Sequence, residues 1–218
     1  MNRATFLIDG FNLYHSAKDV QRVYGFHTKW LDISSLCSSF LQWVSGHATL
    51  QEVYCFSAFA YHLKDPGVIA RHQTYVKCLE ATGIIKELGR FKPKQLVCPQ
   101  YDSSISTCSN CNGQILRHEE KETDVAIASR LLELICSGSC DTIVLVTGDT
   151  DLAPAIRCAR RLLATKEIRF IFPFSRKNNE LARLAPSLTL KPRQYSQYQF
   201  PDPFILPDGT QVAKPANW

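Results

Sequence analysis

Long apolar segments are missing from this sequence. The most apolar runs, such as Ile143 to Val146, fall far short of the ~20 residues that a helix needs to cross a bilayer. The first residues, MNRATFLID, reach an aspartate directly after Phe6, Leu7 and Ile8, whereas a secretory signal carries an apolar core of ~7–15 residues. We therefore expect a cytoplasmic protein without a membrane partner.

Several signatures of enzymes and of secreted proteins are also missing. The sequence holds no Walker phosphate-binding loop, no Ser-His-Asp pattern and no internal repeat. A disulfide framework is not indicated, because the nine cysteines are odd in number and several lie within apolar patterns. In a reducing compartment such residues are thiols or metal ligands.

The composition is that of an ordinary globular protein. Of the 218 residues, 45% are hydrophobic and 21% are charged. This length suits one domain, or one domain with a small insert and a tail, and its main core needs no metal to hold it together. The expected division is a domain over residues 1–190 with an insert at 91–118, followed by a proline-rich tail at 191–218 that we expect to be extended.

The net charge of +5 is distributed unevenly. The segment from Arg157 to Arg193 holds ten Lys or Arg residues and only two acidic ones, whereas a dense acidic stretch lies at residues 119–124. A basic region beside an acidic cluster suits a polyanion that must approach bound cations, although a solvated basic surface would have the same composition.

Apolar periodicity predicts alternating strands and helices. The expected strands are 5–8, 52–60, 84–88, 142–146 and 169–172, and the expected helices are 12–19, 32–45, 66–82, 123–136, 151–163 and 178–184. This alternation predicts an α/β fold with a Rossmann-like parallel sheet flanked by helices. In such sheets the functional crevice lies beyond the carboxyl ends of the strands.

Four aspartates are expected near that crevice. Asp9 follows the first strand, Asp149 and Asp151 follow the strand 142–146, and Asp124 opens the helix before it. Clustered carboxylates repel one another unless a cation lies between them, and hard oxygen ligands favour Mg²⁺ or Mn²⁺. Such ions can drive phosphodiester hydrolysis. The alternative is that these residues only cap helices or close turns.

The insert carries a second candidate metal site. Cys108 and Cys111 form a Cys-x-x-Cys pair, with Cys98 upstream and His118 downstream. Together these four residues can close a tetrahedral structural Zn²⁺ site, which would tie down a polar segment with little apolar content. A redox pair or free thiols are the alternatives.

Three sequence motifs resemble those of the NYN domain family, a branch of the PIN-like nuclease superfamily. They are FLIDGFNLY from Phe6, EEKETDVAIA from Glu119 and VTGDTDL from Val146, in family order. The resemblance implies a PIN-like sheet and an Mg²⁺- or Mn²⁺-dependent ribonuclease whose acidic residues are Asp9, Asp124, Asp149 and Asp151. It also implies that Asn12 is a supporting polar group and that Thr147 orients an acid or a phosphate.

The predicted function is a metal-dependent endoribonuclease acting on single-stranded RNA. Ser175 and Arg176, which follow the strand 169–172, are further candidate phosphate contacts. A non-catalytic RNA-binding or scaffold module is the main alternative. A phosphatase of the haloacid dehalogenase type is less consistent with the sequence, because Phe11 stands where that family has a second aspartate. The sequence does not decide between a monomer and a homo-oligomer.

Overall fold

A six-stranded parallel sheet forms the centre of the molecule, and its strand order is β3-β2-β1-β6-β7-β8. The computed structural model describes residues 1–63, 65–97, 114–162 and 165–216. The strands are β1 (Asn2–Asp9), β2 (Ala48–Ser57), β3 (Ile85–Leu88), β6 (Thr142–Val146), β7 (Glu167–Phe172) and β8 (Ser187–Thr189). The prediction of a parallel α/β sheet is confirmed.

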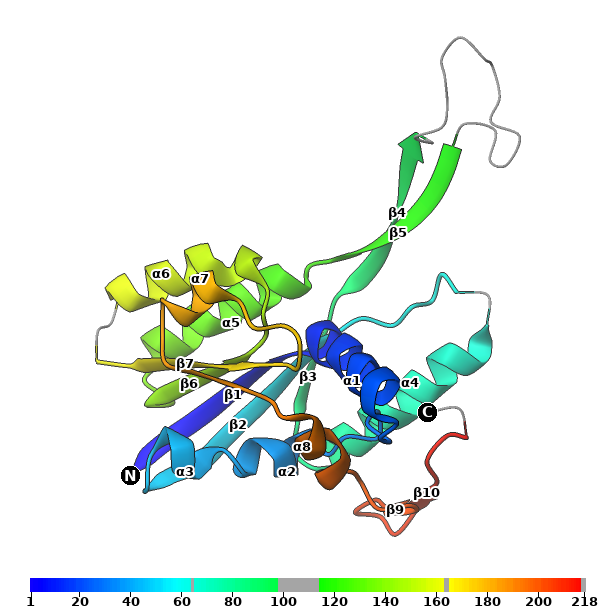
Figure 1. The fold of residues 1–218 in the computed structure, drawn as a ribbon, viewed down its shortest axis with the longest axis horizontal. Helices are drawn as coiled ribbons and strands as arrows, with labels where there is room; N and C mark the ends of the chain where they lie inside the picture. Colours follow the sequence, from blue (N-terminus) through cyan, green and yellow to red (C-terminus); the bar gives the residue numbers. More distant parts are fainter. Residues whose placement is uncertain (64, 98–113, 163–164, 217–218) are drawn as a thin grey trace.

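Helices cover both faces of this sheet (Figure 1). One face carries α1 (Gly10–Tyr24), α2 (Ile33–Ser38), α3 (Leu41–Val44), α4 (Pro66–Ala81) and α8 (Pro192–Gln197), and the other carries α5 (Thr123–Ser137), α6 (Ala153–Leu162) and α7 (Asn179–Ala182). In β1, Phe6 and Ile8 pack into the first core, whereas Leu7 packs into the second. Alternation along one buried strand therefore joins the two layers.

Three predicted helices differ from the observed ones. α1 continues to Tyr24, because Val20 extends its buried face, and it stops at Gly25 in the left-handed conformation. The expected helix 32–45 is two short helices, α2 and α3. The expected helix 151–163 begins as a 3₁₀ turn, η1 (Thr150–Leu152), before α6.

The expectation of an extended tail is wrong. The chain after residue 186 adds β8 and α8, and then a small hairpin of β9 (Phe204–Ile205) and β10 (Gln211–Val212). Tyr195 is fully buried, its hydroxyl bonds with that of Ser16 at 2.6 Å, and Phe200 packs against Trp30. These aromatic side chains bury enough apolar surface to fix a proline-rich segment onto the first core.

The insert begins and ends as an antiparallel ribbon and not as a loop. β4 (Arg90–Val97) pairs with β5 (Gln114–Lys121), and the ribbon rises away from the sheet (Figure 1). An ion pair joins Lys94 to Glu119 across the ribbon at 2.7 Å, and Arg90 pairs with Glu122 just beyond β5. An isolated two-stranded ribbon has no fully buried face, so the hydrophobic alternation that reveals a strand is weak here.

None of the helices in the described part of the chain is long and apolar enough to span a membrane.

Candidate active site

The site begins where β1 and β6 end side by side. β1 lies between β2 and β6, and the strands on its two sides continue the sheet in opposite directions. This is the topological switch point at which open α/β sheets bind ligands. Asp9 is the last residue of β1, and its Oδ1 accepts a hydrogen bond of 2.9 Å from the backbone N–H of Asn12. Asp9 thus caps α1 and is held at the sheet edge.

The turn after β6 is hydrogen-bonded to the junction between β1 and α1. The buried Thr147 hydroxyl donates to Oδ2 of Asp9 at 2.8 Å and accepts from the Asp149 N–H at 3.0 Å. The Gly148 N–H donates to the Asn12 side chain at 3.2 Å. Asp149 in turn caps η1 by accepting from the Asp151 N–H at 2.9 Å. The β1–α1 junction and the turn after β6, which are far apart in sequence, therefore hold Asp9 and Asp149 together.

Gly148 brings a third loop to the site. A Cβ at this position would lie 2.0 Å from the backbone oxygen of Arg176. Only glycine permits this close backbone approach, which delivers the loop after β7 to the sheet edge. Arg176 consequently lines the site, where its guanidinium also donates to Asp19 at 2.8 Å.

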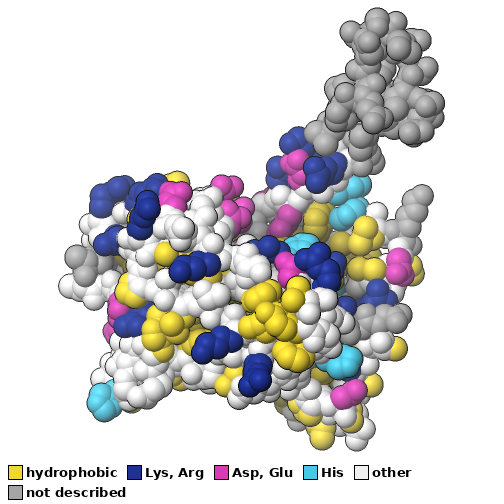
Figure 2. Space-filling model, viewed as in Figure 1, with side chains coloured by type: hydrophobic (Ala, Val, Ile, Leu, Met, Phe, Trp, Pro, Cys, Tyr) yellow, Lys and Arg dark blue, Asp and Glu magenta, His cyan; other side chains and the backbone are white. Residues whose placement is uncertain are grey.

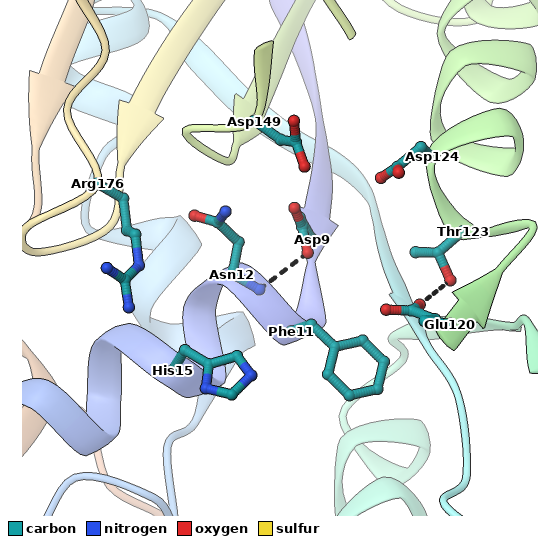
Figure 3. A pocket seen from close by; sticks show the side chains of 9 residues that line it. All are labelled: Asp9, Phe11, Asn12, His15, Glu120, Thr123, Asp124, Asp149 and Arg176. Carbon is teal, nitrogen blue, oxygen red and sulfur yellow. Dashed lines mark hydrogen bonds between the residues drawn. The ribbon is translucent and has the colours of Figure 1, made fainter. Parts of the chain in front are cut away.

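The β5–α5 connection supplies acids from the opposite side (Figure 3). Asp124 lies in the first turn of α5, where a helix N-terminus favours negative charge. Glu122 before it has a φ of 82°, which turns the chain sharply out of β5. Glu120 at the end of β5 accepts a hydrogen bond from the Thr123 hydroxyl, and its other oxygen points into the pocket.

These groups surround one polar pocket of about 380 Å³. Its lining residues are Asp9, Phe11, Asn12, His15, Glu120, Thr123, Asp124, Asp149 and Arg176. It opens to solvent above the carboxyl end of the sheet, as a site for a charged ligand requires.

Burial and mutual repulsion perturb the acids. Burial, together with the carboxylates of Asp124 and Asp149, raises the pKa of Asp9 to about 6, although its two hydrogen bonds oppose the change. Burial also raises the pKa of Glu120 to about 7, and Asp9 and Asp124 contribute to this increase. Burial, followed by Asp149 and Asp151, raises the pKa of Asp124. Strongly shifted carboxyls in a cleft are typical of functional sites.

The negative charge of the pocket is not balanced by ion pairs. In the described part of the chain, no Lys or Arg forms a salt bridge with Asp9, Glu120, Asp124 or Asp149. Oxygen donors with unbalanced charge suit a hard divalent cation. As the side chains lie, however, no three acidic, His or Cys groups among the described residues converge closely enough to form a complete metal site.

The structure brings together five of the residues selected from sequence. Asp9, Asn12, Asp124, Asp149 and Arg176 line the pocket, and Thr147 lies behind Asp9 as its hydrogen-bond donor. Asp151 is exposed beside the pocket, and Ser175, with a φ of 61°, is exposed and outside its lining. Their predicted roles stay predictions.

Sequence reasoning missed Glu120, Phe11 and His15. Glu120 is part of the acidic stretch at 119–124, but nothing in the sequence says which of these carboxylates faces Asp9. The register of the ribbon and the turn at Glu122 decide that.

Three of the four predicted zinc ligands, Cys98, Cys108 and Cys111, lie outside the described residues. The fourth, His118, pairs with Pro93 in the ribbon, and its ring stacks on that of His62 at a centroid distance of 4.2 Å. The zinc site stays a prediction from the sequence.

Comparison with protein families shows that residues 3–189 match the model of the NYN domain family. A search of curated proteins finds no match. One similar solved structure is described as a crystal structure of a deacetylase–teicoplanin complex in the biosynthesis pathway of teicoplanin. It is 10% identical, with 76% of this chain and 68% of that chain covered and a TM-score of 0.30.

Proposed function

This chain belongs to the NYN domain family of the PIN-like nuclease superfamily, and from that premise we propose that it is a metal-dependent endoribonuclease that hydrolyses single-stranded RNA. The observation that carries the proposal is the group of four carboxylates, Asp9, Glu120, Asp124 and Asp149, which line one pocket without a cationic partner among the described residues. Such a pocket repels an RNA phosphate unless cations occupy it.

Asp9, Asp124 and Asp149 are the residues that would hold Mg²⁺ or Mn²⁺. A bound ion supplies Lewis-acid stabilisation of the phosphodiester and a more acidic water. Thr147 and the Asn12 N–H fix both oxygens of Asp9, so this ligand is oriented before any ion arrives. Burial raises the pKa of Glu120 to about 7 in the metal-free fold, and one of its oxygens is directed into the pocket. A bound divalent cation would favour its ionised form, so Glu120 could accept a proton there.

The direct test is cleavage of a labelled single-stranded RNA by the wild-type chain in Mn²⁺, in Mg²⁺ and in chelator. We expect internal cuts with either ion and none in chelator. RNA binding without cleavage under all three conditions would contradict the nuclease proposal and favour a non-catalytic RNA-binding module.

Arg176 is proposed to contact a substrate phosphate. Arg176→Ala is expected to weaken RNA binding and to reduce its salt dependence by about one counterion, because one cation–phosphate contact is lost. Binding measured at several salt concentrations checks this.

The matched control is Arg22→Ala. Arg22 pairs with the same acid as Arg176, Asp19, at 3.0 Å, but it does not line the pocket. Equal effects of both substitutions would assign the loss to Asp19 and remove Arg176 from the phosphate site.

Structural zinc in the insert is proposed as a separate feature. Val97 and Gln114 are paired at the end of the described ribbon, so the segment between them starts and finishes at one place. A metal held by Cys98, Cys108, Cys111 and His118 would close such a segment. Metal analysis of the purified chain is expected to give about one zinc per chain, and its absence would contradict the prediction.

A further inference from the structure

A second cavity, of about 510 Å³, adjoins the acidic pocket. It lies between α1, the chain after β2 and α4, and Phe11 and His15 line both spaces. Its volume falls within the roughly 300–1,000 Å³ of typical ligand pockets. A ligand that extends from one space into the other would contact these shared side chains.

The interior of this cavity suits a flat, largely apolar group. Leu13, Val76 and Leu79 are buried in its wall. Phe11 and Phe91 meet edge to face at 5.7 Å beside it. Polar groups also line the cavity, and among them the Ser57 hydroxyl and the His72 Nε2 lie 3.3 Å apart. Aromatic rings stack on nucleobases through their faces, and a hydroxyl–imidazole pair can form hydrogen bonds with a base edge.

Positive charge accompanies this apolar interior. The lining contains no Asp or Glu among the described residues, but it contains Lys18, Lys29 and Arg71. Lys18 and Lys29 form no ion pair in the described part of the chain, and Arg71 only approaches Asp65 at 3.8 Å. Burial lowers the pKa of Lys29, and Lys18 and Arg71 add to this change. Cations that repel one another beside an apolar cavity suit a ligand carrying an anion.

Figure 2 shows histidine, apolar, and Lys or Arg side chains together with Asp or Glu side chains near the foot of the β4–β5 ribbon. The acidic pocket and this cavity thus differ in chemistry although they share walls. One is rich in carboxylates, and the other is apolar and cationic.

We propose that this cavity is a base pocket, which takes an unstacked base of single-stranded RNA while Lys18, Lys29 and Arg71 contact a neighbouring phosphate. The inference rests on the proposed function. It places in this cavity the base of the nucleotide adjacent to the phosphodiester bond that would be cleaved at the acidic pocket. A base in a duplex is stacked and paired, so it cannot enter. The base pocket would therefore select single strands.

The test measures binding of two labelled strands of equal length, an oligouridine and an abasic ribose-phosphate strand, to the full chain carrying Asp149→Asn. Both strands carry the same backbone charge. Oligouridine is expected to bind about tenfold more tightly, the scale of base stacking on protein side chains. Val68→Trp, which fills the cavity from α4, is expected to abolish this difference. Gln73→Trp, at an exposed position of the same helix outside the cavity, should preserve it.

A second pair of variants avoids any dependence on filling the cavity. Arg71→Ala should weaken binding of both strands by a similar factor, and Lys77→Ala, exposed on the same helix and outside the cavity, should not. Equal affinity for the two strands, or a difference that survives in a folded Val68→Trp chain, overturns the base pocket.

Cleavage by the wild-type chain is measured separately. RNA cleavage together with equal binding of the two strands would overturn the base pocket and leave the nuclease proposal intact. Base-dependent binding that Val68→Trp abolishes, without cleavage in Mg²⁺ or Mn²⁺, would support the base pocket and contradict the nuclease proposal.

Discussion

Replacing Asp149 with asparagine is expected to lower RNA cleavage at least about a hundredfold and to leave the fold intact. Asparagine keeps a side-chain oxygen for the Asp151 N–H, which Asp149 now accepts at 2.9 Å, so the cap of η1 survives. The substitution removes one of the negative charges that line the pocket, and preorganised charge is commonly worth two to three orders of magnitude in rate. Initial cleavage rates in Mn²⁺ and Mg²⁺, together with thermal unfolding, measure both parts of this expectation.

Asp32→Asn is the matched control for this variant. Asp32 caps α2 by accepting from the Ser35 N–H at 3.0 Å, and it does not line the acidic pocket. It therefore undergoes the same chemical change in the same structural role. A folded Asp149→Asn chain that cleaves at the wild-type rate, or equal losses in the two variants, would remove Asp149 from the catalytic group.

Replacing Asp9 with asparagine is expected to stabilise the metal-free chain at neutral pH. The pKa of Asp9 is about 6 in the fold and 3.8 as a reference, so the folded chain retains its proton to a higher pH than the unfolded chain. Stability is therefore lost as the pH rises from about 4 to about 6, and this loss amounts to about 3 kcal/mol at neutral pH. Asparagine avoids this cost, and we expect a gain of about 1–3 kcal/mol in the free energy of unfolding.

Divalent cations should reverse the advantage of the variant. Mg²⁺ or Mn²⁺ in about hundredfold excess over its dissociation constant stabilises a binding-competent fold by about 2.7 kcal/mol. The wild-type chain should gain this stability, whereas Asp9→Asn should gain much less. Urea unfolding between pH 4 and pH 8, with and without the ions, measures both effects.

Asp141→Asn provides a control of opposite sign. Hydrogen bonds from Arg3 lower the pKa of Asp141, so its contribution to stability is present at neutral pH and fades as the pH falls below its usual range. This variant should be less stable than wild type at pH 7, and Mg²⁺ should not change that difference. If Asp9→Asn also lowers stability at pH 7 and Mg²⁺ does not change the difference from wild type, burial and repulsion do not destabilise the ionised carboxylate of Asp9.

Local sequence patterns were sufficient for the central elements. The buried run Thr142–Val146 and the short run before Asp9 are apolar except for Thr142 and Thr5, and aspartates follow or end both strands. Strand type, parallel pairing and the location of the acids at the carboxyl ends follow from these features. The three motifs added the family.

Local patterns failed where contacts between distant segments stabilise an element. Tyr195 is buried, and its hydroxyl forms a hydrogen bond with that of Ser16, 179 residues away in sequence. A proline-rich segment that lacks periodicity therefore folds onto the core through contacts with a distant helix. The ribbon β4–β5 is stabilised by pairing between its strands and by a cross-strand ion pair. Neither kind of contact produces a periodic signal within one segment.

The sequence by itself determined five of the six strands of the sheet, the order of the main helices and the placement of aspartates near one edge, because those depend on the periodicity of short segments and on which residues follow each strand. The tertiary structure alone decided which carboxylates share a pocket, that Glu120 joins them and that Arg176 reaches them past Gly148. It also created the neighbouring apolar and cationic cavity, whose walls come from β2, α1, α4 and the ribbon. The physical reason is that pKa values, charge balance and cavity shape depend on distances between side chains that the folded chain alone brings together, as Thr147 and Asp9 show across 138 residues.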